Sequence, residues 1–151
     1  MKILLATDGT IYGDATAEML GKLTLDSGDE VKVISVVDVG MPMAIDIYGG
    51  YLPDTTELEK SAGENASKFV DSAVEKIKAR LEGKTVNVSG DILFGSPDSR
   101  IVETAEEMHA DLIIIGSHGY KSWERLLLGS VSDSVVHHAP CSVLVVRTPA
   151  E

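Results

Sequence analysis

The sequence has little cysteine, few aromatic residues and no long apolar run. Its one cysteine, Cys141, cannot form an intramolecular disulfide, which fits the reducing cytoplasm and a buried, inert thiol. No apolar run approaches the roughly 20 residues that cross a bilayer. Met1-Lys2 leads directly into a short apolar segment, unlike a secretory signal. We therefore expect a cytoplasmic protein with no membrane partner.

Basic residues are also scarce. The chain has 13 Lys and Arg against 24 Asp and Glu, for a net charge of −11. Its basic residues do not gather in a stripe, and nucleic-acid binding needs concentrated Lys and Arg, so we expect no nucleic-acid partner. A small phosphorylated ligand is compatible with the negative charge, because backbone N–H groups can hold phosphates.

Strand-like segments alternate with helical ones along the chain. The expected strands are Lys2–Ala6, Val31–Val37, Thr85–Leu93, Asp111–Ile115 and Ser142–Val146. Four helices are expected. The first has Ala15, Met19, Leu20 and Leu23 on one face, and the second covers Asp54–Leu81 with Phe69 on its apolar face. The third begins with Ser96 as cap and Pro97 at its first position, and the fourth covers Ser130–His138. Nearly continuous apolar strands are typical of sheets buried on both faces.

This alternation predicts the α/β fold class. We expect residues 1–151 to form one domain, an open, doubly wound, Rossmann-like parallel sheet of five strands with helices on both faces. Ligands of such sheets bind outside the carboxyl ends of the strands, where the strand order reverses. A long loop, residues 38–53, holds two prolines and three glycines. Loops of this length are usually lids, binding loops or disordered segments. We expect Met41–Pro53 to be a flap that is mobile without ligand and partly ordered with it, and the alternative is a disordered surface loop with no role in binding.

The most informative motif joins two glycine clusters. Gly116-Ser117-His118-Gly119 follows a strand, and Gly129-Ser130-Val131-Ser132 opens a helix nine residues later. Glycines let the backbone approach a ligand closely, and a helix N-terminus attracts anions. Hydroxyls of Ser130 and Ser132 could donate to the same phosphates. The alternative interpretation is two ordinary glycine turns and a serine-capped helix.

With these residues the chain resembles the universal stress protein family, and specifically its ATP-binding branch. That branch carries Gly, two residues, Gly, nine residues, Gly, and then Ser or Thr. Further family landmarks in the expected order are Ile3-Leu4-Leu5-Ala6-Thr7-Asp8, Val36-Val37-Asp38, Gly95-Ser96-Pro97, Asp111–Gly116 and His138-Ala139-Pro140-Cys141. The chain departs at Ala6, where many members have proline, and at Ser35, where many have histidine. The resemblance spans essentially the whole chain.

The resemblance implies that ATP, or ADP or AMP, binds with a divalent cation such as Mg²⁺. It implies that Asp8 contacts the nucleoside, Val36 pairs with adenine through its backbone, and the glycine clusters hold ribose and phosphates. The nucleotide-binding residues expected on this basis are Ala6, Asp8, Val36, Ile115, Gly116, Gly119, Gly129, Ser130, Val131 and Ser132. Asp8 has an alternative role as a helix cap. Lys121 and Arg125 lie between the clusters and could reach the phosphates or face solvent.

The resemblance implies a nucleotide-dependent stress-response or signalling protein. We expect slow or no hydrolysis, because the matched positions include no water-positioning base, P-loop lysine or arginine finger. The alternative is an ATPase or nucleotidyl transferase on the same fold. A phosphoacceptor receiver domain is less favoured, because the first strand ends in a lone acidic residue, Asp8, and the third ends in Phe94-Gly95.

Other motifs are weaker. Gly83-Lys84-Thr85 is similar to the end of a P-loop, but Lys78 occupies the required first glycine position. We assign no metal site, and we expect His137-His138 to complement a helix C-terminus. His118 lies in the glycine loop without a visible catalytic partner, so we assign no catalytic residue.

The last strand, Ser142–Val146, is expected to form a homodimer interface. Its run of valine and leucine is too apolar for an exposed sheet edge, and edge strands readily pair with another chain. Universal stress proteins commonly dimerise through this strand, so the resemblance implies the same contact. The alternative is a monomer whose edge is blunted by Arg147, Thr148 and Pro149.

Overall fold

The computed structural model describes residues 1–9, 11–38, 56–117 and 128–147. Along the chain lie β1 (Lys2–Ala6), α1 (Ile11–Leu20), β2 (Glu30–Val37), α2 (Thr56–Arg80), β3 (Asn87–Phe94), α3 (Pro97–Met108), β4 (Leu112–Gly116), α4 (Ser130–His138) and β5 (Ser142–Val146). The expected alternation is confirmed, and each strand ends within two residues of its predicted bounds. No helix in the described ranges is long and apolar enough to cross a membrane.

The five strands form one parallel sheet in the order β3-β2-β1-β4-β5. The chain runs from the central β1 outward through β2 to β3, then crosses back to β4 on the other side of β1. The strand order therefore reverses between β1 and β4. This is the switch point at which ligands of doubly wound sheets bind.

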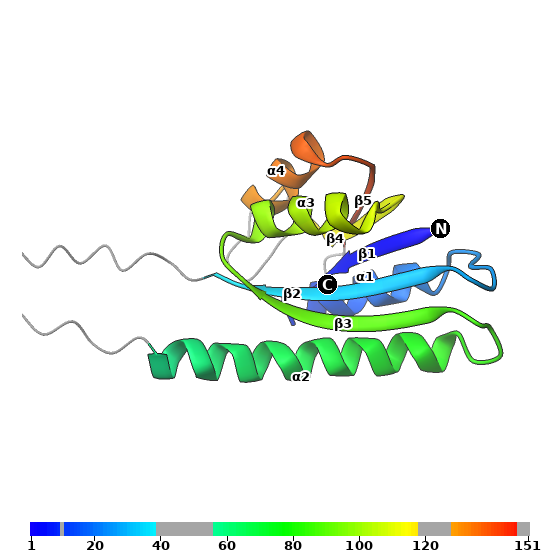
Figure 1. Ribbon diagram of the computed structural model, residues 1–151, viewed down its shortest axis with the longest axis horizontal. Coiled ribbons are helices and arrows are strands. Elements are labelled where there is room, and N and C mark those ends of the chain that lie inside the picture. The colour runs from blue at the N-terminus through cyan, green and yellow to red at the C-terminus, as the bar shows by residue number, and fades with distance from the viewer. Residues whose placement is uncertain (10, 39–55, 118–127, 148–151) are drawn as a thin grey trace, which may run out of the picture.

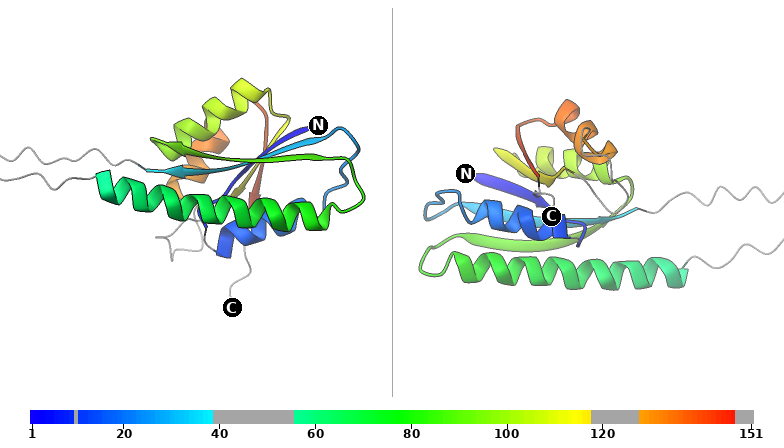
Figure 2. Two further views of the ribbon diagram at one scale, coloured as in Figure 1. Left: turned by 60° about the horizontal axis from the view of Figure 1, so that its bottom comes forward. Right: turned by 180° about the vertical axis from the view of Figure 1, so that it is seen from behind.

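Helices cover both faces of the sheet, as predicted (Figure 1). One core lies under α1 and α2 and includes Leu5, Val33, Leu20 and Ile77, all at most 1% exposed. The other lies under α3 and α4 and is built around Ile34, Ile113, Ile101 and Val135. Figure 2 shows α1 and α2 side by side on one face, where they also contact one another. The doubly wound fold class is thus confirmed.

Three local expectations were wrong. Phe69 is 38% exposed and lies outside the core cluster, with its ring against the backbone of Gly9. Leu23 lies beyond α1, in a turn whose N–H bonds to the Leu20 carbonyl, although it still packs on the core. Ser96 occupies the N-cap position before Pro97, but its hydroxyl donates to Asp98 at 2.6 Å and caps no backbone N–H.

Candidate functional site

The candidate site is the edge of the sheet formed by the carboxyl ends of β2, β1 and β4. Ala6 pairs with Ile34 in the β1–β2 register, and the Thr7 N–H donates to the Ile34 carbonyl at 2.9 Å, which carries the pairing past the end of β1. β1 ends at Ala6 and β2 ends at Val37, so the predicted nucleoside contacts Asp8 and Val36 lie at the carboxyl ends of neighbouring strands.

The β1–β4 register brings the other half of the edge to the switch point. Leu5 pairs with Ile114, so the next residues, Ala6 and Ile115, lie side by side. Both side chains are nearly buried, at 9% and 6% exposed, and both belong to the core under α3 and α4. Only the backbone of these two predicted site residues is therefore positioned to meet a ligand at the edge.

Ser117, directly after Gly116, joins the end of β4 to Gly129 of the second glycine cluster. The Gly129 N–H donates to the Ser117 carbonyl at 2.8 Å, and the Ser117 N–H donates to the Val146 carbonyl at 2.8 Å. Ser117 is 2% exposed. Its backbone therefore ties the start of α4 to the ends of β4 and β5, beside Gly116.

The Ser132 hydroxyl was expected to donate to a phosphate, but in the structure it bonds to backbone carbonyls. Its side chain is buried, and the hydroxyl lies 3.1 Å from the Ser117 carbonyl oxygen and 2.9 Å from that of Gly129. A serine hydroxyl carries one hydrogen, which these carbonyls use. Among the expected hydroxyl donors, the exposed Ser130 is available to a ligand.

The N-terminus of α4 faces this edge with donor groups. Gly129 is the N-cap and supplies no side-chain cap, and Ser130, Val131 and Ser132 form the first turn. In an α-helix the N–H groups at these positions have no acceptor within the helix. Together with the positive end of the helix dipole they favour an anion, such as a phosphate.

The turn that carries Asp8 is braced from two sides. Thr7, only 8% exposed, bonds to β2 through its N–H, and its Oγ1 accepts the Gly9 N–H at 3.3 Å. Gly9 has φ of +74°, a left-handed conformation that favours glycine. Asp8 itself is exposed at the edge.

Sequence reasoning missed Thr7, Ser117 and Phe69 as residues that shape this site. Thr7 and Ser117 are buried polar residues directly after the two central strands, and that position is the signal that could have revealed them. No sequence signal links Phe69 to Gly9. The expectations for His118, Gly119, Lys121, Arg125 and the Met41–Pro53 loop lie outside the described residues.

Asp98 of α3 has a perturbed pKa, and it joins α3 to α4. The hydroxyls of Ser96 and Ser134 donate to its carboxylate at 2.6 and 2.7 Å and hold the pKa of Asp98 below its usual value. At the far end of α4, the Nδ1 groups of His137 and His138 donate to the Asp133 and Ser134 carbonyls at 2.8 Å each.

Burial raises the pKa of the half-buried Cys141 thiol, which keeps it in its neutral, unreactive form at pH 7. Among the described residues, no group of three His, Cys, Asp or Glu side chains is arranged to hold a metal ion.

The family model described as the universal stress protein family matches residues 1–147. The chain belongs to this family. A universal stress protein of Methanocaldococcus jannaschii, MJ0531, is 36% identical over 98% of this chain and 82% of its own length.

Solved structures support the same fold. The protein MJ0577, solved to assign its biochemical function from structure, has a TM-score of 0.70 at 29% identity, over 99% of this universal stress protein and 97% of its own chain. A family protein of Arabidopsis thaliana, solved with AMP bound, has a TM-score of 0.68 at 18% identity, over 99% of this chain and 93% of its own.

Proposed function

We propose that this universal stress protein binds ATP at the carboxyl edge of β1 and β4 and acts as a nucleotide-dependent stress-response or signalling protein. The observation that most directly supports this proposal is the hydrogen bond between Gly129 and Ser117, which sets the N-terminus of α4 beside Gly116 at the switch point. Anion-binding donors and the place where such sheets bind ligands coincide there. The Arabidopsis protein with bound AMP shares the fold at 18% identity, so the proposal rests on the residues of this chain.

In this proposal the nucleotide lies across the strand ends. Asp8 contacts the ribose, the Val36 backbone pairs with adenine, and the backbones of Ala6, Ile115 and Gly116 form the floor. The N–H groups of Ser130, Val131 and Ser132 and the Ser130 hydroxyl hold the phosphates, with Gly119 completing the family pattern. A divalent cation such as Mg²⁺ would accompany the phosphate oxygens, its usual ligands in nucleotide sites.

We propose slow hydrolysis or none. None of the matched positions among the described residues is an arginine or lysine, and Asp8 is the one carboxylate among them, whereas efficient phosphoryl transfer uses several charged groups around the γ-phosphate. The other candidate is an ATPase or nucleotidyl transferase. A phosphate-release assay with metal controls separates the two, because only an enzyme gives many turnovers per minute.

Calorimetry with ATP, ADP and AMP tests the binding proposal directly. We expect saturable one-site binding that requires an intact glycine pattern. Mass spectrometry of the protein purified without added nucleotide should identify which adenine nucleotide it retains. An absence of heat, of retained nucleotide and of any shift in the unfolding temperature with ATP would overturn the proposal.

We also propose a homodimer through β5. This strand pairs only with β4 among the described strands and so forms one edge of the sheet. Val143, Leu144 and Val145 are half-buried in the single chain, which leaves apolar area for a partner. Pairing of two copies of β5 would close that edge symmetrically.

A further inference from the structure

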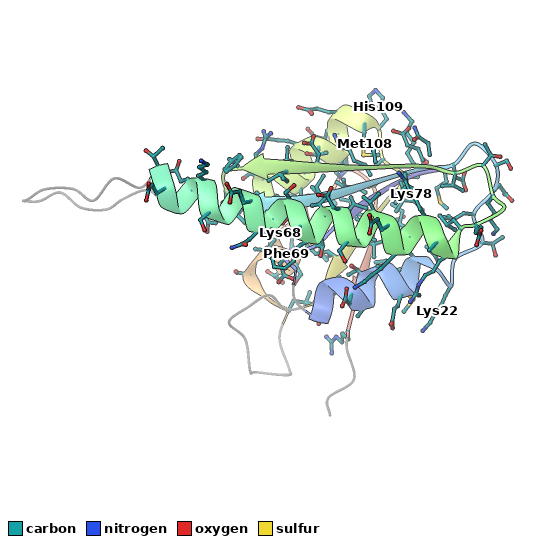
Figure 3. All side chains as sticks on the ribbon, turned by 90° about the horizontal axis from the view of Figure 1, so that it is seen from below. Lys22, Lys68, Phe69, Lys78, Met108 and His109 are labelled. Carbon is teal, nitrogen blue, oxygen red and sulfur yellow. The ribbon has the colours of Figure 1, made fainter. Side chains whose placement is uncertain are left out.

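Phe69 of α2 packs on the turn that carries Asp8. A Cβ built on Gly9 would lie 2.1 Å from Cδ2 and 2.3 Å from Cγ of the Phe69 ring. The ring edge therefore fills the space above the Gly9 backbone that any other residue would need. Figure 3 shows Phe69 projecting from the side of α2 that faces α1. The contact joins a helix of the core layer to the loop after β1.

The two neighbours of Asp8 are thus held by different elements. On one side, Thr7 bonds to the Ile34 carbonyl of β2. On the other side, Gly9 is held from within the turn by Thr7 Oγ1 and from outside by the Phe69 ring. Asp8 lies between these two attachments, with its side chain exposed at the edge of the sheet.

The Phe69 ring is buried less completely than its apolar neighbours on α2. It remains 38% exposed, although the same helix buries Val70 and Ala73 almost completely in the core. A large ring that covers a glycine backbone immobilises that backbone, because glycine otherwise has the greatest conformational freedom. Holding a loop in its bound conformation lowers the entropy that a ligand must overcome.

We propose that Phe69 is a positioning residue for the nucleoside end of the site, acting through Gly9 to fix Asp8. This inference rests on the proposed function, since Asp8 is the ribose contact in it. The Phe69 ring packs on Gly9, whereas the proposed phosphate donors lie at the N-terminus of α4. Removal of the ring therefore weakens the nucleoside end of the site and spares the phosphate end.

The test compares Phe69→Ala, Phe69→Tyr and a control, Val74→Ala, which trims α2 where it meets Gly90 of β3. By calorimetry, we expect Phe69→Ala to weaken AMP and ATP binding about tenfold while inorganic tripolyphosphate binds unchanged. Phe69→Tyr should restore the affinity, because it keeps the ring. Val74→Ala should leave all three affinities unchanged.

A double-mutant cycle with Asp8→Ala shows whether Phe69 acts through Asp8. In the Asp8→Ala background, Phe69→Ala should cause no further loss of AMP affinity. An additive loss, or an equal loss of tripolyphosphate affinity, would overturn the positioning role. Unchanged AMP affinity in Phe69→Ala would also overturn the positioning role, provided that the wild type binds AMP. If the wild type binds no adenine nucleotide, the proposed function is overturned, and the positioning role of Phe69 toward that ligand is overturned with it.

Discussion

Gly129 lies at the proposed phosphate site in an unstrained backbone conformation. Its φ of −63° and ψ of 155° are open to every residue, so a side chain there meets no conformational penalty. We expect Gly129→Val to weaken ATP binding by at least about tenfold, because its methyl groups intrude on the phosphates, and Gly129→Ala to weaken it less.

Calorimetry gives the affinities of the two Gly129 variants, and thermal unfolding without ligand is the control. The unfolding temperature should stay close to that of the wild type in both. A variant that binds ATP normally would remove Gly129 from the site.

Asp98 gives the protein a defined response to acid. Hydrogen bonds from Ser96 and Ser134 lower the pKa of Asp98 in the folded state. A lowered folded pKa contributes stability above the unfolded pKa, near 3.8, and that contribution is lost as the pH falls through the folded pKa. Asp98→Asn should therefore cost about 1 kcal/mol at pH 7.

The stability difference between wild type and Asp98→Asn should shrink as the pH falls below 3.8, because a protonated Asp98 bonds much as asparagine does. Urea unfolding at several pH values measures this difference. A difference that is constant from pH 7 to pH 3 would contradict the assignment.

The positions of residues that lie next to an apolar segment in the sequence could be predicted. Contacts between residues that are distant in sequence could not. Asp8, Gly116 and Gly129 lie next to apolar segments in the sequence, so their place at the edge could be expected from the order of elements alone. Ser132 was assigned the wrong hydroxyl contact, because its burial depends on Ser117, which is distant in sequence. The ring of Phe69 matched the helical period, but that period does not reveal a partner in another loop.

At the scale of elements, α2 packs on β3 with almost no space at Gly90. A Cβ there would lie 2.5 Å from Val70 Cγ1 and 3.0 Å from Val74 Cγ2. Both are β-branched residues on a helix, whose methyl groups cannot rotate away easily. Gly90→Ala should therefore destabilise the protein by about 1 to 3 kcal/mol.

Urea unfolding of Gly90→Ala, Val70→Ala and the double variant tests this contact. Val70→Ala removes the closest methyl group, so the double variant should be more stable than the two single losses predict by addition. Strict additivity would show that the sheet and helix relax apart instead. The strands and helices themselves followed from apolar periodicity, whereas this close approach depends on the final packing.

At the scale of the whole molecule, β5 pairs only with β4 among the described strands, and this edge predicts a homodimer. Sedimentation at micromolar concentration should show a dimer, and Val145→Pro should shift it toward monomer because proline removes a ladder donor. Ser89→Lys, on the opposite edge strand β3, is the matched control and should leave the dimer intact. Circular dichroism checks that each variant is folded. A wild type that sediments as a monomer would refute the interface.

The central position of β1 has a consequence for synthesis on the ribosome. β1 is the first strand of the chain, yet Ile3 pairs with Leu112 of β4, which is translated more than a hundred residues later. At 5 to 20 residues per second, one side of β1 waits roughly 5 to 20 seconds for its partner. The phosphate-binding half of the proposed site, Gly116 to Ser132, emerges later still. Nucleotide bound at the complete site therefore cannot cover that side of β1 while the chain is being made.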